Sequence, residues 1–219
     1  MKFERPEAHG SLTRLSKDAH LVFLQESLEA MAHASVQGKK TQRIFAPGYR
    51  SSTAQTGVEI RSSFPIDVSC TLRFIEPWLR TPKAAAVARL EIRGVKVLAI
   101  NLHAVNFSFG TADYTAQLDT LGELVAAHTG AVIFGGDLNN WSGKREQRLR
   151  EFAARHKLKR VVFEPDWRSR HLGRAVDGFL VRDLEVASAT AIPSLESDHH
   201  PIRLTLRIPA AADSPAPDA

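Results

Sequence analysis

Short apolar or alternating runs, each bounded by turn residues, recur along most of the chain. Such runs predict β-strands, because a period of two places one side of each strand against a core. Gly94 lies between two of these runs and predicts a hairpin turn that joins them. Ten strands are expected, at residues 19–24, 56–60, 68–74, 85–92, 96–101, 131–134, 160–163, 176–181, 185–191 and 202–208.

Two longer segments have the spacing of amphipathic helices instead. Residues 111–129 place their apolar side chains on one face, and Gly130 follows as a stop signal. Residues 144–158 have a narrower apolar stripe, and Ser142 precedes them as a candidate N-cap. Around ten strands with few helices predict a layered α/β or α+β fold, in which two packed sheets form a β-sandwich flanked by helices.

Size and composition fit one domain over residues 1–208. The chain has 219 residues, of which 43% are hydrophobic and 24% charged, and this mixture is ordinary for a globular protein. Residues 209–219 are small, proline-rich and without periodicity, which predicts a disordered tail. The single cysteine, Cys70, cannot form an internal disulfide, and its alternating neighbours predict a buried or half-buried strand position.

The sequence carries no signal for a membrane or for export. It has no run of about 18 apolar residues, which a membrane-spanning helix would need, and its early part is too polar for a signal peptide. A cytoplasmic location is therefore expected, with the periplasm left open. The net charge of +5 favours polyanionic partners such as nucleic acids or phospholipid headgroups, and fits a generally basic surface equally well.

Polar side chains with catalytic or metal-binding chemistry follow the apolar runs of several predicted strands. Glu26, His103 and Asp137 each come after such a run, and strand ends open onto loops that can present functional groups. Asn139 lies two residues beyond Asp137, so both side chains lie on the same side of an extended segment. Asp177 lies inside an apolar run, where a carboxylate needs a partner. Each residue alone is more often structural, so their combination carries the argument.

Five short motifs occur in order between residues 23 and 199. Together they resemble the signature motifs of the endonuclease/exonuclease/phosphatase superfamily, which implies a DNase I-like fold and a metal-dependent phosphoesterase. Residues 103–110 and 136–142 are similar to an uncharacterised bacterial branch of that superfamily, and the resemblance covers the chain except its tail. The motifs are Phe23-Leu-Gln-Glu26, Asn101-Leu-His103, Gly135-Gly-Asp-Leu-Asn139, Ala175-Val-Asp-Gly-Phe179 and Ser197-Asp-His199.

The resemblance implies a role for each motif residue. Glu26 is the expected ligand of a Mg²⁺ ion, with Mn²⁺ as a substitute, and Asp198 helps to hold that ion or its water shell. His199 and Asp177 form a dyad in which the carboxylate orients the imidazole. Asp137 positions or deprotonates the attacking water, and whether it or His199 takes the proton stays open.

The remaining candidates are expected to contact the substrate. Asn139 and His103 would donate hydrogen bonds to phosphoryl oxygens, and His103 is a candidate acid for the leaving group. Four further residues are weaker candidates for substrate binding, because a solvated charge or a core aromatic explains them at least as well. They are Lys83, Trp141, Arg145 and Arg174.

The resemblance leaves the substrate open. Phosphodiester hydrolysis, including nuclease action on DNA or RNA, is the leading hypothesis, and a phosphomonoesterase or a phospholipid-type phosphodiesterase are alternatives on the same fold. The superfamily normally begins with a strand that ends in asparagine, whereas residues 1–22 contain no asparagine. The usual first strand is therefore expected to be missing, and a catalytically impaired binding protein is a further alternative. We expect a monomer that binds a phosphate-ester substrate, with nucleic acid among the options.

Overall fold

Most strands of this computed structural model, which describes residues 12–31 and 41–209, belong to two sheets that face each other. A six-stranded sheet has the order β4 (Ile66–Ile75), β5 (Pro82–Ile92), β6 (Val95–His103), β7 (Ala131–Asp137), β11 (Asp177–Arg182) and β8 (Lys159–Arg160). A three-stranded sheet has the order β1 (Leu21–Leu28), β3 (Gln55–Ser62) and β2 (Gln42–Arg50). Two smaller pairs are β12 (Glu185–Ala191) with β13 (Ile202–Arg207), and β9 (Arg170–His171) with β10 (Arg174–Ala175).

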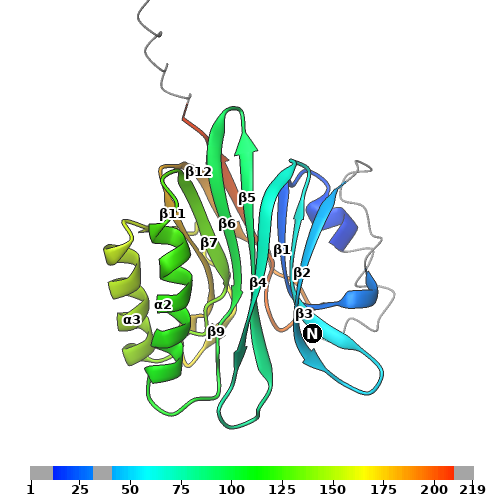
Figure 1. Ribbon diagram of the computed structural model, residues 1–219, viewed down its shortest axis with the longest axis vertical. Coiled ribbons are helices and arrows are strands. Elements are labelled where there is room, and N and C mark those ends of the chain that lie inside the picture. Colours follow the sequence, from blue (N-terminus) through cyan, green and yellow to red (C-terminus); the bar gives the residue numbers. More distant parts are fainter. Residues whose placement is uncertain (1–11, 32–40, 210–219) are drawn as a thin grey trace, which may run out of the picture.

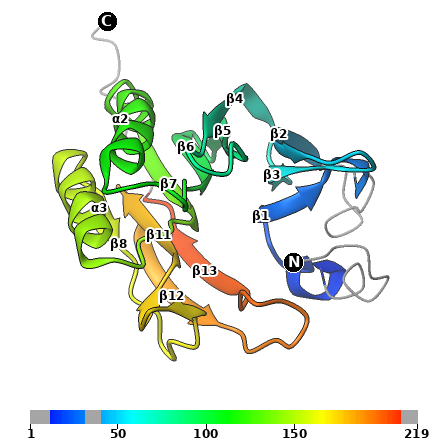
Figure 2. The ribbon, with the colours of Figure 1, turned by 90° about the horizontal axis from the view of Figure 1, so that it is seen from below.

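Helices cover the outer face of the six-stranded sheet. Figure 2 shows α2 (Ala112–Ala126) and α3 (Gly143–Arg155) on one side of this sheet and β1, β2 and β3 on the other. A short 3₁₀ helix, η1 (Glu29–Met31), follows β1. Within the described residues, no helix is long and apolar enough to cross a membrane.

Alternation along β5 builds the two main cores. Ala85 and Val87 pack with α2 and α3 on one face, and Ala86 and Leu90 pack against β2 and β3 on the other. Alanines keep the side chains of β5 short, so the facing sheet can approach closely. A third cluster joins β11 to the β12–β13 pair. These layers confirm the expected sandwich (Figure 1).

The predicted elements match observed ones, and three further strands are present in the described part of the chain. All ten predicted strand segments overlap observed strands, both predicted helices form, and Gly94 lies in the turn between β5 and β6. Ser142 caps α3 by accepting a hydrogen bond from the Arg145 backbone N–H at 3.2 Å. Pattern reasoning missed β2, because Pro47 and Gly48 interrupt its apolar alternation. It also missed β9 and β10, which have two residues each and are too short to show a period.

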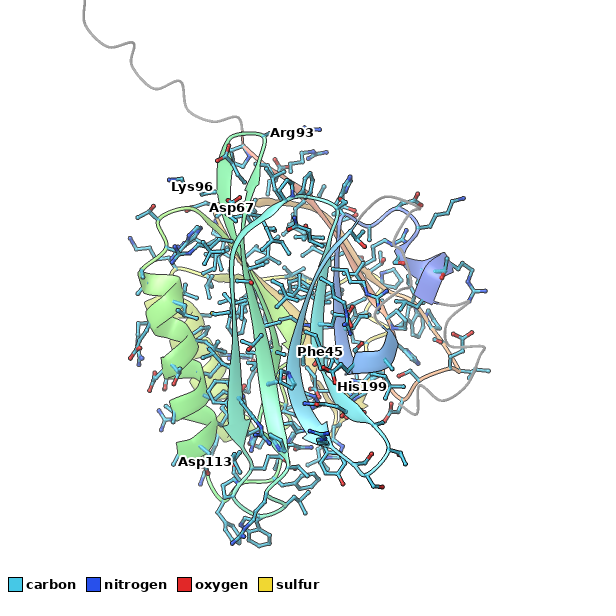
Figure 3. All side chains as sticks on the ribbon, turned by 45° about the vertical axis from the view of Figure 1, so that its right-hand side comes forward. Phe45, Asp67, Arg93, Lys96, Asp113 and His199 are labelled. Atoms are coloured by element: carbon cyan, nitrogen blue, oxygen red, sulfur yellow. The ribbon has the colours of Figure 1, made fainter. Side chains whose placement is uncertain are left out.

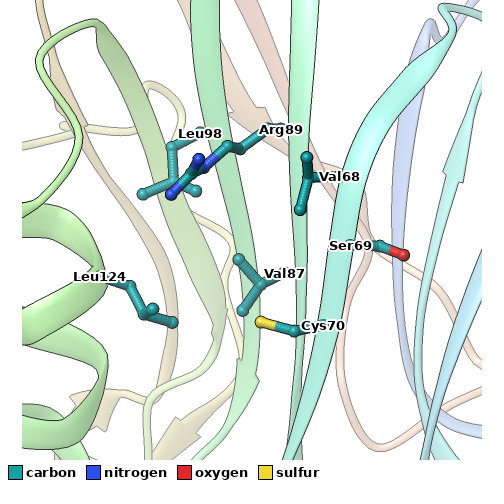
Figure 4. A pocket seen from close by; sticks show the side chains of 7 residues that line it. All are labelled: Val68, Ser69, Cys70, Val87, Arg89, Leu98 and Leu124. Carbon is teal, nitrogen blue, oxygen red and sulfur yellow. The ribbon is translucent and has the colours of Figure 1, made fainter.

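The expectation for Cys70 was wrong. Cys70 is exposed, because β4 is the edge strand of the six-stranded sheet and the helices do not cover it there. Beside it, Val87 and Leu124 help to line a cavity of about 50 Å³ that none of the candidate residues lines (Figure 4). Two other expectations lie largely outside the described residues: the missing first strand concerns residues 1–22, of which 1–11 are not described, and the disordered tail concerns residues 209–219, of which only 209 is described.

Candidate active site

Strand register brings three of the candidate side chains together. β6 and β7 run parallel, and their register pairs His103 with Asp137. β11 runs antiparallel to β7 and pairs Asp177 with Asp137. Side chains that are directly paired lie on the same face of a sheet, and all three residues are buried. The ends of β6, β7 and β11 therefore form one polar group at one edge of an apolar sheet.

His199 joins this group from the segment that connects β12 to β13. Its Nδ1 donates a hydrogen bond to Asp177 Oδ2 at 2.7 Å. This hydrogen bond raises the pKa of His199 to about 9, against the opposing effect of partial burial, and the negative charges of Asp177, Asp137 and Asp198 add to the rise. The imidazole is therefore protonated at neutral pH, and Asp177 fixes its orientation.

Asp137 lies between the dyad and the loop that follows β7. Burial raises the pKa of Asp137 to about 7, the charge of Asp177 adds to the rise, and His199 opposes it. Asn139 donates to both carboxylate oxygens, through its backbone N–H to Oδ1 and through Nδ2 to Oδ2, each at 3.1 Å. Asn139 Nδ2 also donates to Ala104 O at 2.9 Å, which ties this loop to the segment after His103.

Lys83, which the sequence marked only as a weak candidate, contacts the centre of the site. Its ammonium Nζ donates to His103 Nε2 at 2.8 Å, because a protonated lysine has no lone pair to accept with. Burial lowers the pKa of His103 well below its usual value, and the positive charges of Lys83 and His199 lower it further. His103 is therefore neutral, and its Nε2 also lies 3.3 Å from Asp137 Oδ2.

Glu26 comes from the facing sheet, where a bulge presents it. The register of β1 against β3 shifts between Leu24 and Ser27, and Glu26 between them has a φ of 49°. A non-glycine residue rarely adopts such a positive φ, and a bulge redirects a side chain away from the normal alternation. As a result, the Glu26 carboxylate is exposed while Ser27 beside it is buried.

A buried asparagine connects this bulge to the six-stranded sheet. Asn101 Nδ2 donates to Leu24 O and Glu59 O, both at 3.0 Å, and Asn101 Oδ1 accepts from Gln25 Nε2. Gly136 leaves the space for this contact, because a Cβ there would lie 2.6 Å from Gln25 Nε2 and 2.2 Å from the Leu102 carbonyl oxygen. The residue before Glu26 thus packs against the residue before Asp137, which joins the two sheets at the site.

A buried ion cluster supports the bulge from below, and the sequence reasoning missed it. The Glu59 carboxylate is fully buried and accepts hydrogen bonds from Ser27, Arg43 and Arg61. Burial alone would raise the pKa of Glu59, but these three hydrogen bonds together bring it below its usual value. The sequence did contain a signal for this cluster: Glu59 lies inside the predicted strand at residues 56–60, and Arg61 follows it directly.

The donors near Glu26 fit a hydrated magnesium ion better than a closed metal cage. Over residues 12–31 and 41–209, no three His, Cys, Asp or Glu side chains are grouped to hold a metal. Mg²⁺ keeps several waters and is commonly held by one or two carboxylates together with substrate phosphate. Gln25 precedes Glu26, and its Oε1 atom is buried and accepts no hydrogen bond from the described part of the chain. An exposed carboxylate beside a spare buried oxygen suits such an ion.

The other weak candidates differ in position. Arg145 is wrong as a substrate contact: it is 1% exposed and donates to the carbonyl oxygens of Val105, Asn106 and Asn139. Trp141 is half-buried, donates to Asn106 Oδ1 at 2.8 Å and stacks under the Arg145 guanidinium. Both hold the loops around the site together. Arg174 is exposed in β10, and its role as a substrate contact stays a prediction.

The described contacts gather five of the predicted residues into one network: His103, Asp137, Asn139, Asp177 and His199. Glu26 lies at the β1 bulge next to Gln25, which contacts Asn101 on β6, and Asp198 is exposed and helps to raise the pKa of His199. Figure 3 shows His199 toward the end of the molecule opposite the β5–β6 hairpin, which Arg93 marks. This arrangement can hold a phosphate between a cationic imidazole, Lys83 and an ionisable carboxylate.

Comparison with known proteins agrees with this geometry. A family model described as "Endonuclease/Exonuclease/phosphatase family" matches residues 8–199. A UPF0294 protein from Klebsiella pneumoniae (strain 342) is 36% identical over 208 residues, which cover 92% of this chain and 77% of the relative. A similar relative from Yersinia pseudotuberculosis is 37% identical over 197 residues and covers 87% of this chain and 74% of its own.

Solved structures match the fold at low sequence identity. The endonuclease/exonuclease/phosphatase from Bacteroides vulgatus has a TM-score of 0.71 at 14% identity and covers 91% of this chain and 90% of its own. A mannosyl-6-phosphatase from Bacteroides thetaiotaomicron has a TM-score of 0.66 at 16% identity, covering 92% and 91%. Sphingomyelinase C from Streptomyces griseocarneus has a TM-score of 0.63 at 16% identity, covering 90% of each chain.

Proposed function

The chain belongs to the endonuclease/exonuclease/phosphatase family, whose members hydrolyse phosphate esters, and we propose that it is a Mg²⁺-dependent phosphodiesterase. The observation that carries this proposal is the position of the buried Asp137 carboxylate, which lies 3.3 Å from His103 Nε2 and is paired across β7 and β11 with Asp177, the partner of His199. Such an arrangement offers a base for water next to positive charge for phosphoryl oxygens, and both are needed for phosphoester hydrolysis.

Glu26 would hold the metal, and Asp198 would help to order the water around it. When bound, Mg²⁺ supplies positive charge that neutralises a non-bridging oxygen and the leaving oxygen of the phosphate. The bulge that presents Glu26 and the Asn101 contacts that fix it support this assignment. Mn²⁺ has the same preference for carboxylate oxygen and should substitute.

The chain's own residues provide the proton chemistry. Asp137 would accept a proton from the attacking water as its oxygen bonds to phosphorus, and the bond from phosphorus to the leaving oxygen breaks. His199, held by Asp177, would contribute positive charge to a phosphoryl oxygen and not act as the base, because it is already protonated. Lys83 would donate to another phosphoryl oxygen, and Asn139, whose N–H groups are donated to Asp137 and Ala104, would hold the Asp137 carboxylate in place. A neutral His103 is poorly suited to be the acid and would act as a hydrogen-bond partner.

Hydrolysis of chromogenic esters tests this proposal. The protein should release nitrophenol from bis(p-nitrophenyl) phosphate with Mg²⁺ and should lose this activity in excess EDTA. Asp137→Asn should lower kcat by roughly 10²–10⁴-fold, the usual contribution of a general base. The matched control is Asp119→Asn, an exposed carboxylate on α2 that pairs with Arg155, and this variant should retain full activity. Full activity of the metal-free protein would contradict the mechanism, and binding of the ester without turnover would favour a non-catalytic binding protein.

The same assay separates the possible substrate classes. A mannosyl-6-phosphatase and a sphingomyelinase share the fold, so a monoester and a phospholipid headgroup diester are the comparisons to run beside DNA and RNA. We propose the diester class because a singly charged diester needs less positive charge than a doubly charged monoester, and the cationic side chains that contact His103 and the Asp177 carboxylate are Lys83 and His199. Faster turnover of p-nitrophenyl phosphate than of the diester would reverse this choice.

A further inference from the structure

Five large apolar side chains are exposed at the end of the molecule that carries the candidate site. They come from the end of β4 and the turn that joins it to β5, and from the loop between β6 and α2, both at the lower end in Figure 1. Their exposed fractions run from 53% to 74%, which is unusual for five residues on two adjoining loops. We call this set the apolar rim: Ile75, Trp78, Leu79, Phe107 and Phe109.

The two loops of the apolar rim are fixed to each other. Trp78 from one loop meets Phe109 from the other, with ring centroids 4.1 Å apart in an edge-to-face arrangement. Beneath them, the buried Glu76 carboxylate accepts from the backbone N–H groups of Asn106 and Phe107 at 2.6 and 3.2 Å and from the hydroxyl of Thr81. The apolar side chains are therefore held outward by an ordered base, and ordering them costs little on binding.

The apolar rim borders the site. Lys83 follows the first loop at the start of β5, and His103 precedes the second loop at the end of β6. The side chains of these two residues contact each other at 2.8 Å. Figure 3 shows Asp113, four residues after Phe109, at the lower end of the molecule, and His199 in the lower half on the opposite side. Whatever the apolar rim touches is thus brought next to the candidate phosphate position.

Cations accompany the apolar rim. Arg73 and Arg80 are exposed beside it, and no salt bridge among the described residues involves either of them. The acidic residues nearby are less exposed than these arginines: Glu76 is buried under the turn, and Asp113 at the start of α2 is only partly exposed. Exposed arginine next to tryptophan, phenylalanine and leucine matches the chemistry of an anionic membrane interface, where headgroups meet cations and acyl chains meet apolar side chains.

We propose that the apolar rim docks the active-site end of this protein onto the surface of an anionic phospholipid bilayer. Ile75 and Leu79 favour a bilayer over nucleic acid, because aliphatic side chains cannot stack on bases and the Trp78–Phe109 pair already turns a ring edge onto a ring face. A second protein chain fits less well, because a specific interface needs about 800 Å² from each partner, and five side chains at two loop tips offer less.

Vesicle binding in EDTA tests this proposal independently of catalysis. The full chain should sediment with vesicles of phosphatidylcholine containing 30% phosphatidylglycerol. Its affinity for these vesicles should be about tenfold higher than for phosphatidylcholine alone, because each of the two arginines should raise the affinity roughly a few-fold. Its tryptophan emission should shift to the blue as Trp78 enters the interface. A Trp78→Ser, Phe109→Ser double variant should lose at least tenfold in binding while its circular dichroism and melting curve stay unchanged.

Three matched variants keep the test decisive. Val162→Ser and Leu195→Ser remove exposed apolar side chains outside the apolar rim, and both should bind like the parent. Trp78→Phe should bind normally but lose the emission shift, which separates the probe from the binding. Equal vesicle binding by the parent and the double variant overturns the proposal. Binding of a single-stranded oligonucleotide that depends on Trp78 and Phe109, with no vesicle binding, would replace the bilayer with nucleic acid.

Discussion

Glu26 and Asn139 have backbone conformations that most strand and loop sequences avoid. Their φ values are 49° and 45°, and a non-glycine residue held there costs of order 1 kcal/mol. The surrounding contacts offset that cost: Asn139 is held by Asp137 and Ala104, and the Glu26 bulge is held through Asn101. Two strained residues at one site indicate that side-chain placement, and not local preference, fixes these positions.

The dyad gives the sharpest prediction at the residue scale. In Asp177→Asn, the pKa of His199 should fall from about 9 toward the usual 6.5, because its strongest hydrogen-bond acceptor loses its charge. A raised folded-state pKa contributes stability that is complete below pH 6.5 and is lost as the pH rises to about 9. The variant should therefore be less stable than the parent at pH 6 and nearly equal to it at pH 9.5.

Proton NMR of the His199 ring and urea unfolding at the two pH values measure these effects. Asp119→Asn serves as the control, since its exposed pair with Arg155 contributes little. A His199 that titrates near pH 9 in both proteins would show that Asp177 does not set its charge.

At the scale of elements, Gly136 controls the joint between the two sheets. Its φ of +128° and the approach of the Leu102 carbonyl, 2.2 Å from an added Cβ, make any side chain costly. Gly136→Ala should lower the free energy of unfolding by more than about 3 kcal/mol, because strain and steric overlap both act. Gly173→Ala is the matched control: its φ is +78° but nothing lies within 4 Å, so about 1 kcal/mol is expected. Equal losses in urea unfolding would mean that close packing at the joint is unimportant.

Helix α3 acts on the site through Arg145. This guanidinium donates to three carbonyl oxygens and to Ser108 Oγ, and it lies over the Tyr114 and Trp141 rings. Arg145→Lys keeps the charge but loses the planar fork, which leaves buried carbonyls unpaired, so a loss of about 2–4 kcal/mol is expected.

Chemical unfolding of Arg145→Lys measures this loss, with Arg148→Lys on the exposed face of α3 as the control. Among the described residues Arg148 pairs with Glu151 on the surface alone, so its replacement should change stability by less than about 0.5 kcal/mol. Normal stability of Arg145→Lys would show that the hydrogen-bond fork is not needed.

At the scale of the whole molecule, pattern reasoning recovers what depends on periodicity and local order. Ten of the strands, both helices and the Ser142 cap follow from alternation and capping, and the five-membered polar network lies at or next to strand ends. Contacts between distant segments have no such signal. The burial of Arg145, the exposure of Cys70 on an edge strand and the Lys83–His103 contact depend on which strands become neighbours, and the order of strands in a sheet cannot be read from their spacing alone.

Metal binding should be visible in the stability of the whole molecule. An ion that binds the folded chain and not the unfolded one stabilises it by RT ln(1 + [L]/Kd), which is about 1.4 kcal/mol when the Mg²⁺ concentration is ten times Kd. For a chain of this size, that corresponds to a rise of about 3–6 °C in Tm. The rise should disappear in Glu26→Gln, which keeps the shape of the side chain but removes the charged ligand. Glu29→Gln is the matched control, because it changes an exposed glutamate in η1, three residues away. Scanning calorimetry in MgCl₂ and in NaCl of equal ionic strength separates binding from screening. The same rise in Tm in Glu26→Gln as in the parent would mean that the ion binds elsewhere. Asp137 would then be the next carboxylate to test, because a buried carboxylate attracts a cation more strongly than an exposed one.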